Sequence, residues 1–138
     1  MNKIKENPLI KKLLSLNLPT DDYAVFGSGP LYAHNIIKKP RDLDVLARGE
    51  AWKKALKLGK LEKLPLGSRA VRLFNGRVEI VDTWVPGKWD VDELIDTAEI
   101  IEGIRFVKLE NVLKWKRKMG RPKDLKHIKM IEKYIKEL

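Results

Sequence analysis

The sequence predicts one α/β or α+β domain over residues 1–138, with a small mixed β-sheet, flanking helices and a helical C-terminal end. Short β-type runs alternate with helical patterns in the first half, a hairpin signal lies near the middle, and two helical patterns close the chain. Such an order is typical of helices that pack on a mixed sheet. The chain of 138 residues has room for one core, which we expect over residues 20–107, followed by a helical pair over 109–137.

The elements of the first half follow from hydrophobic periodicity and from turn residues. Apolar positions at helical spacing indicate a helix, and compact β-type runs indicate strands. Pro30 favours a helix start just after the Gly27-Ser28 turn, because proline suits the first helical turn. In chain order we expect a helix over 5–16, a strand over 23–26, a helix over 30–37, a strand over 42–47 and a helix over 50–58.

The elements of the second half are separated by stronger turn signals. Asn75-Gly76 predicts a type I′ hairpin turn, because both residues tolerate positive φ. Gly120 and Pro122 separate the last two helices, since glycine ends helices and proline begins them. We expect strands over 70–74 and 77–82, a loop at 84–87, a short helix beginning near Asp90 or Asp92, an extended segment over 99–107, and helices over 109–119 and 122–137.

The charge balance of the chain is strongly basic. The formal net charge is +10 and the sequence pI is near 9.8. This balance favours phosphate-rich partners, either nucleic acid or a nucleotide. A Lys/Glu-rich surface of the kind found in thermophiles explains the charge equally well, and the absence of glutamine fits that composition.

Composition also excludes several classes of protein. The chain has no cysteine, which excludes disulfides and thiolate metal sites. No stretch approaches the roughly 18 apolar residues that span a bilayer. Residues 1–14 lack an unbroken apolar region followed by a cleavage site, so we expect no signal peptide. A cytoplasmic protein without a membrane partner is the resulting expectation.

Two aspartates form the first candidate for a chemical site. Asp42 and Asp44 lie two residues apart in a predicted strand, so both carboxylates project from one face. Like charges on one face repel each other, and burial of an unpaired carboxylate is costly. A divalent cation such as Mg²⁺ or Mn²⁺ resolves this conflict, because it binds carboxylate oxygens and leaves positions for phosphates. Taken alone, the pair also fits a solvated strand end.

The Gly27-Ser28 turn before the second predicted helix is the next candidate. Such a turn presents backbone N–H groups and a hydroxyl to an anion, and a helix dipole adds attraction. An ordinary glycine turn with a serine cap has the same local pattern. Together with the aspartate pair, the turn predicts a phosphate site beside a metal ion.

A third carboxylate is expected on a neighbouring strand, and the hairpin offers Glu79 and Asp82. They lie three residues apart, so they face opposite sides of the sheet and only one can join the pair. Glu79 has apolar neighbours in the middle of the strand, whereas Asp82 lies at the strand end. We prefer Glu79 and keep Asp82 as the alternative.

These motifs resemble the polymerase-β-type nucleotidyltransferase superfamily. Its signature is a hydrophobic-Gly-Ser turn, an Asp-x-Asp strand and a later strand with one acidic residue between hydrophobic ones. The matching segments are Val25-Phe26-Gly27-Ser28, Pro40-Arg41-Asp42-Leu43-Asp44-Val45 and Val78-Glu79-Ile80. Residues 116–125 are similar to the segment after the core in small bacterial and archaeal members, including the nucleotidyltransferase-type toxins of abortive-infection systems. The resemblance covers roughly residues 22–135.

The resemblance implies transfer of a nucleoside monophosphate from a nucleoside triphosphate to a hydroxyl acceptor, with release of pyrophosphate. Asp42, Asp44 and Glu79 would hold Mg²⁺ or Mn²⁺ and act as the catalytic residues, and Gly27 and Ser28 would bind the phosphates. The identity of the nucleotide stays open, as does an RNA, protein or small-molecule acceptor. The alternative is a non-catalytic protein of the same fold that binds RNA or a partner protein, as in toxin–antitoxin pairs.

Two cations complete the expected nucleotide contacts. Arg41 directly precedes the first aspartate. Lys116 lies on the apolar stripe of the predicted 109–119 helix, at helical spacing from Val112. Because lysine seldom points inward without a partner, Lys116 either contacts the triphosphate at the rim of the site or reaches solvent or Asp124.

Overall fold

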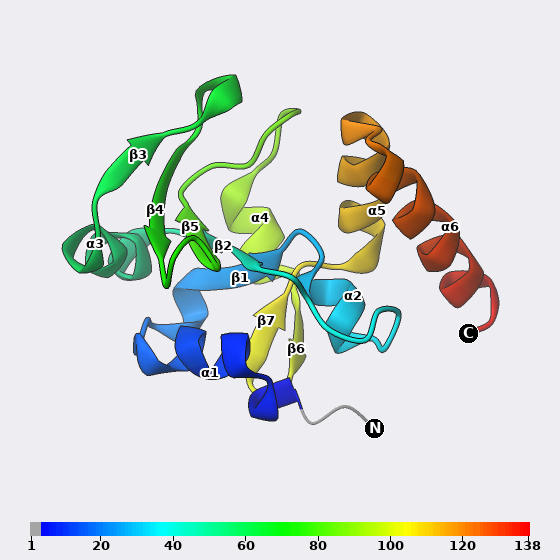
Figure 1. The fold of residues 1–138 in the computed structure, drawn as a ribbon, viewed down its shortest axis with the longest axis horizontal. Coiled ribbons are helices and arrows are strands. Elements are labelled where there is room, and N and C mark those ends of the chain that lie inside the picture. The colour runs from blue at the N-terminus through cyan, green and yellow to red at the C-terminus, as the bar shows by residue number, and fades with distance from the viewer. Residues whose placement is uncertain (1–3) are drawn as a thin grey trace.

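The computed structural model describes residues 4–138 and shows a seven-stranded mixed sheet with helices on both faces (Figure 1). The predicted mixed class of helices and strands is therefore confirmed. The strand order is β3-β4-β5-β2-β1-β7-β6. The strands are β1 (Tyr23–Phe26), β2 (Leu43–Ala47), β3 (Leu61–Lys63), β4 (Arg69–Leu73), β5 (Val78–Val81), β6 (Glu99–Ile101) and β7 (Ile104–Phe106). The helices are α1 (Pro8–Ser15), α2 (Gly29–Ala33), α3 (Gly49–Leu58), α4 (Val91–Asp96), α5 (Leu109–Met119) and α6 (Pro122–Lys136), with 3-10 turns η1 (Ile4–Glu6), η2 (Thr20–Asp22) and η3 (Pro65–Gly67).

The centre of the sheet combines parallel and antiparallel pairing. β1 runs antiparallel to β2, whereas β2 runs parallel to β5 and β1 runs parallel to β7. Parallel strands need a crossover connection, and between β2 and β5 the chain passes through α3, β3 and β4. The N-terminal ends of β2 and β5 consequently lie side by side.

Alternating side chains divide the buried residues into two cores, one on each face of the sheet. On one face, here named the α1 face, α1 and α3 cover the central strands. On the other, the α5 face, α4 and α5 cover them, and α6 packs against α5. Leu43 and Val45 of β2 belong to the α1 face, and Leu46 belongs to the α5 face. Asp44 alternates with Leu43 and Val45, so it projects to the α5 face.

The turns follow the predicted residue chemistry. Asn75 and Gly76 have φ of 58° and 79°, and the Arg77 N–H donates to the Phe74 carbonyl at 3.1 Å, as a type I′ turn requires. The segment expected to be extended over 99–107 is the β6–β7 hairpin. Its turn contains Gly103, whose φ is 80°.

The C-terminal helical pair ends and begins where the sequence predicts. Gly120 terminates α5 with a φ of 62°, and Pro122 is the first residue of α6. The two helices lie side by side at one end of the sheet (Figure 1). Within residues 4–138, no helix is both long and apolar enough to cross a bilayer.

The second helix is shorter than predicted, since it ends at Ala33 and not near residue 37. Asn35 adopts a left-handed conformation with a φ of 62°. The next N–H, of Ile36, donates back to the Leu31 carbonyl at 2.8 Å. This hydrogen bond closes the helix end as a Schellman motif does, with asparagine in the place that glycine usually takes.

Two element starts and one additional strand also differ from the prediction. The first helix begins at Pro8 and not at residue 5, because the Asn7 side chain accepts the N–H groups of Leu9 and Ile10 as an N-cap. The strand β3 was not predicted, because its three residues are all exposed at the sheet edge and show no alternation. β2 begins at Leu43, so Asp42 lies just before the strand.

Ile80 tests the position of the core on the α1 face. Its side chain is 0% exposed in a central strand, so Ile80→Ala should lower the free energy of unfolding by about 2–5 kcal/mol. The matched control is Ile100→Ala, at a side chain that is 61% exposed, which should change it by less than about 0.5 kcal/mol. Urea denaturation of the two variants measures both values. Equal losses would contradict this assignment of the core.

Candidate functional site

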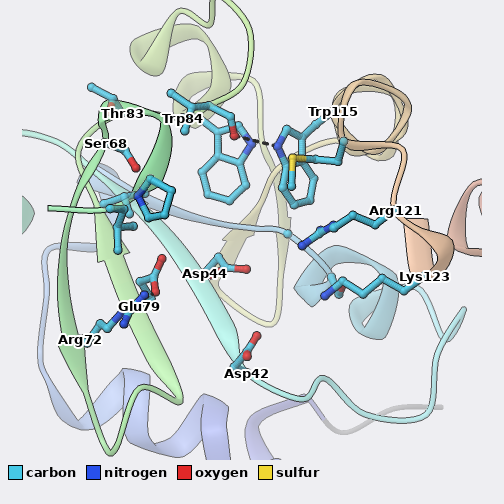
Figure 2. Close-up of a pocket in the computed structure, with 17 residues that line it drawn as sticks. Asp42, Asp44, Ser68, Arg72, Glu79, Thr83, Trp84, Trp115, Arg121 and Lys123 are labelled. Atoms are coloured by element: carbon cyan, nitrogen blue, oxygen red, sulfur yellow. Dashed lines mark hydrogen bonds and ion pairs between the residues drawn. The ribbon is translucent and has the colours of Figure 1, made fainter. Parts of the chain in front are cut away.

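A cleft on the α5 face brings five of the predicted site residues together. Its cavity of about 370 Å³ lies between β4 and β5 on one side and the α5–α6 junction on the other (Figure 2). The predicted residues that line it are Gly27, Ser28, Asp42, Asp44 and Glu79. They come from the β1–α2 turn, from the start of β2 and from β5.

Strand register places two of the carboxylates side by side. In the parallel pairing of β2 with β5, Asp44 lies opposite Glu79, so both side chains project from the α5 face. Asp42 is exposed just before β2 and lines the same cleft (Figure 2). The three acidic residues expected from the sequence therefore border one cavity.

Asp82 lies on the opposite face of the sheet. Its carboxylate forms an ion pair with Arg69, and the Arg69 guanidinium lies 5.8 Å from the Trp52 ring of α3. Because α3 covers the α1 face, Asp82 is separated from the cleft by the sheet. Of the two acidic residues considered for the later strand, Glu79 is the one that borders the cleft.

Gly27 is required where it stands for two reasons. Its φ is 63°, and a Cβ at this position would overlap the Oδ2 atom of Asp44. A side chain would therefore strain the backbone and also displace the carboxylate. The turn and the aspartate strand form one packing unit.

Ser28 lines the cleft at the N-cap of α2, but its hydroxyl does not cap the helix. The Ser28 Oγ accepts a hydrogen bond from the Lys116 Nζ at 3.3 Å. Since α2 has only five residues, its dipole contributes little to anion binding. Attraction for an anion at this turn must come mainly from nearby cations.

Lys116 lies behind the turn and not at the rim of the cleft. Its side chain is 0% exposed, and its Nζ contacts the Asp124 Oδ1 at 3.4 Å. Asp124 also accepts hydrogen bonds from the Arg121 Nε at 2.6 Å and from the Arg121 N–H at 3.1 Å. Burial lowers the pKa of the Lys116 ammonium, while Asp124 raises it. Lys116 thus forms the alternative pairing with Asp124. Its ammonium does not line the cavity, where contact with a triphosphate was expected.

Arg41 is not among the residues that line the cleft. Its side chain is exposed, and it lines a separate groove on the side of α1. The Arg77 Nη1 donates to the Arg41 carbonyl at 3.3 Å. The position expected for Arg41, beside the nucleotide site, is therefore not the one that the structure shows.

The cleft also contains cations and aromatic rings outside the set of site residues predicted from the sequence. Arg121 and Lys123, from the α5–α6 junction, point toward Asp44 from the opposite wall (Figure 2). Trp84 and Trp115 line the same cavity, with ring centroids 5.0 Å apart. In the sequence these residues are visible only as a basic helix junction and as scattered tryptophans. They come together only through the fold of the chain.

Trp84 and Trp115 are held in place by contacts outside the cavity. Phe26 stacks on Trp84 with ring centroids 4.1 Å apart and an interplanar angle of 5°. The Trp115 Nε1 donates to the Val85 carbonyl at 3.0 Å. A flat ring that entered the cavity would meet rigid aromatic side chains.

Asp44 carries an electrostatic conflict. The pKa of its carboxyl is raised from 3.8 to about 7, mainly by burial and further by the nearby charges of Asp42 and Glu79. Lys123 and Lys116 oppose the shift. Within residues 4–138, Asp44 forms no hydrogen bond or ion pair through its side chain. A cation bound here would relieve the conflict.

The donor set partly fits a divalent metal ion. Carboxylate oxygens are the ligands that Mg²⁺ prefers, and within the described chain neither Asp42 nor Asp44 has a cationic partner. Glu79, by contrast, accepts a hydrogen bond from the Arg72 Nε at 2.9 Å. In the arrangement of residues 4–138, no three acidic or histidine side chains are grouped closely enough to hold a metal ion. Asp42 and Asp44 are therefore the residues that could bind one first.

Comparison with known proteins does not assign the chain to a family. The sequence matches no protein-family model, and it has no significant match among curated proteins or solved structures. The resemblance to polymerase-β-type nucleotidyltransferases stays a prediction from the motifs. The fold and the cleft define an α/β protein with an acidic pocket faced by cations.

Replacement of Gly27 tests its contact with Asp44. Gly27→Ala should reduce the free energy of unfolding by more than Gly76→Ala, because both positions have positive φ but only Gly27 faces another group. Backbone strain alone costs about 1–2 kcal/mol. Urea denaturation of both variants, repeated in an Asp44→Ala background, isolates the contact. An excess loss that persists without the carboxylate would contradict it.

Asp44 should make stability depend on pH. Its folded-state pKa of about 7 exceeds the ordinary 3.8, so the folded protein binds more protons between these values. Proton binding by Asp44 therefore contributes to the free energy of unfolding fully below pH 3.8. This contribution is lost as pH rises to about 7, with a slope of up to about 1.4 kcal/mol per pH unit. Denaturation of wild type and Asp44→Asn from pH 4 to pH 8 measures the difference. Parallel pH profiles would contradict the raised pKa.

Proposed function

We propose that this protein is a metal-dependent nucleotidyltransferase that moves a nucleoside monophosphate from a nucleoside triphosphate to a hydroxyl acceptor. The proposal is carried by the meeting of Asp42, Asp44 and Glu79 in one cleft with the Gly27-Ser28 turn. Acidic residues on adjacent strands and a cationic opposite wall are the groups that a metal–triphosphate complex requires.

The three carboxylates would have different roles. Asp42 and Asp44 would hold magnesium, which when bound neutralises triphosphate charge and orients the phosphates for in-line displacement. Asp44 must lose its proton for this, so metal and proton compete for the same oxygens. Glu79 would have to release Arg72 before it could accept the proton of the acceptor hydroxyl. The acceptor oxygen then bonds to the α-phosphorus, and pyrophosphate leaves.

The opposite wall would bind the triphosphate and the base. Lys123 and Arg121 face the carboxylates across the cavity, where their charges favour phosphate oxygens. Trp84 and Trp115 line the same cavity, where a base could pack against them. Lys116 acts through Ser28, because it contacts the hydroxyl and not the cavity.

A non-catalytic protein that binds RNA or a partner protein, as in toxin–antitoxin pairs, is the second candidate. The ion pair between Glu79 and Arg72 favours it, because this pair keeps the third carboxylate from binding a metal ion. Such a protein would use the cleft without turnover.

Calorimetric titration with ATP, CTP, GTP and UTP, with and without magnesium, tests the proposal. Wild type should bind at least one nucleotide only when magnesium is present, and Asp44→Asn should weaken this binding by about tenfold or more. Without magnesium, Asp44→Asn should bind nucleotide as well as wild type or better, because a repelling charge is removed. The tightest nucleotide identifies the donor for assays of pyrophosphate release.

Two matched variants complete this experiment. Glu79→Gln should weaken magnesium-dependent binding or stop pyrophosphate release, whereas Asp82→Asn on the opposite face should leave both unchanged. Binding of no nucleotide by wild type would overturn the proposal and favour the second candidate. Magnesium-dependent nucleotide binding of unchanged affinity in Asp44→Asn would place the metal elsewhere.

A further inference from the structure

A second, larger groove lies beside the cleft on the side of α1. Its cavity of about 710 Å³ is bordered by the start of α1, by the loop before β2 and by the β4–β5 turn. Four of its lining residues are cations, Lys12, Lys39, Arg41 and Arg77, and none of its lining residues is acidic. The sequence motifs assign no role to this combination.

The cations of this groove are left without acidic partners. Six of the eight arginines in the sequence form ion pairs with carboxylates: Arg48, Arg69, Arg72, Arg105, Arg117 and Arg121. The two arginines that form none within residues 4–138 are Arg41 and Arg77, and both line this groove. Lys12 and Lys39 likewise have no ion pair in the described part of the chain. The groove therefore presents four positive charges, unpaired within the described residues, to an anion from outside the chain.

Apolar side chains lie among these cations. Leu9, Pro40 and Phe74 line the same groove, and Phe74 is 37% exposed at the hairpin turn. The Lys12 Nζ lies 5.8 Å from the Phe74 ring. Cations next to an exposed aromatic ring are the combination with which proteins bind single strands, through phosphates and stacked bases.

We propose that this groove binds the sugar-phosphate backbone of a single-stranded nucleic acid. Four cations contributed by three separate segments match a chain of phosphates better than one isolated phosphate. A positively charged groove can follow the backbone of a single strand. The net charge of +10 favours the same class of partner.

Consecutive residues before β2 line the groove and the cleft. Arg41 lines the groove, and the next residue, Asp42, lines the cleft. The Leu43 N–H donates to the Arg77 carbonyl at 2.8 Å, which joins the two strand starts between the cavities. A strand held in the groove would present a terminal hydroxyl to the carboxylates. This last step rests on the proposed nucleotidyl transfer, whereas binding in the groove does not.

Fluorescence anisotropy with labelled 12-nucleotide oligo(U) and oligo(dT) tests the binding. Lys12→Ala/Lys39→Ala should weaken binding about tenfold at low salt and reduce the salt dependence, the slope of log K against log salt, by about 1.4. The matched control is Lys129→Ala/Lys133→Ala, which removes the same charge from exposed positions on α6. The control should bind as wild type does.

The outcomes separate this proposal from the proposed enzyme. Asp44→Asn should bind both oligonucleotides normally, so failure of nucleotide binding in the cleft leaves the groove proposal standing. Equal losses in the two double-lysine variants would overturn it, because binding would then follow net charge alone. Absence of oligonucleotide binding by wild type at 50 mM salt would also overturn it, as would groove-dependent binding to phosphatidylserine vesicles in its place. A preference for oligo(U) over oligo(dT) would identify RNA as the ligand.

Discussion

The parallel pairing of β2 with β5 places the carboxyl groups of Asp44 and Glu79 next to each other, and the rest of the cleft is arranged around this concentration of negative charge. Neighbouring acids on one face of a sheet repel each other, and burial increases the cost. The two carboxylates have different surroundings. Glu79 has Arg72 beside it on β4, whereas Asp44 has no direct partner in the described chain and keeps a raised pKa.

Cations reach this region from the far end of the sequence. The α5–α6 junction carries Arg121 and Lys123 to the wall opposite Asp44, and α5 places Lys116 behind Ser28. Lys116 and Asp124 are both fully buried, and breaking such a pair leaves an uncompensated charge. The C-terminal helical pair therefore completes the site electrostatically as well as sterically. The acidic strands alone would form only half of it.

Sequence patterns predicted the features that depend on local chemistry. The turn at Asn75-Gly76 and the boundary at Gly120 are set by residues that favour particular backbone angles. Strand alternation predicted that only one of Glu79 and Asp82 could join the aspartate pair, and the mid-strand position of Glu79 correctly favoured it as the cleft residue. The directions of Arg41 and Lys116 were not predictable in this way. Each depends on how distant segments pack, and a periodic pattern fixes only the face from which a side chain leaves.

The contact between Lys116, Ser28 and Asp124 has a consequence for how this protein can vary among organisms. Asp124 is the carboxylate that balances the buried Lys116 ammonium, so a change of Asp124 alone would leave an uncompensated charge behind Ser28. In related sequences these positions should covary: a neutral residue at 116 should accompany a neutral residue at 124. The two C-terminal helices would thus evolve as one unit, and they contact the Gly-Ser turn although 87 residues separate Ser28 from Lys116.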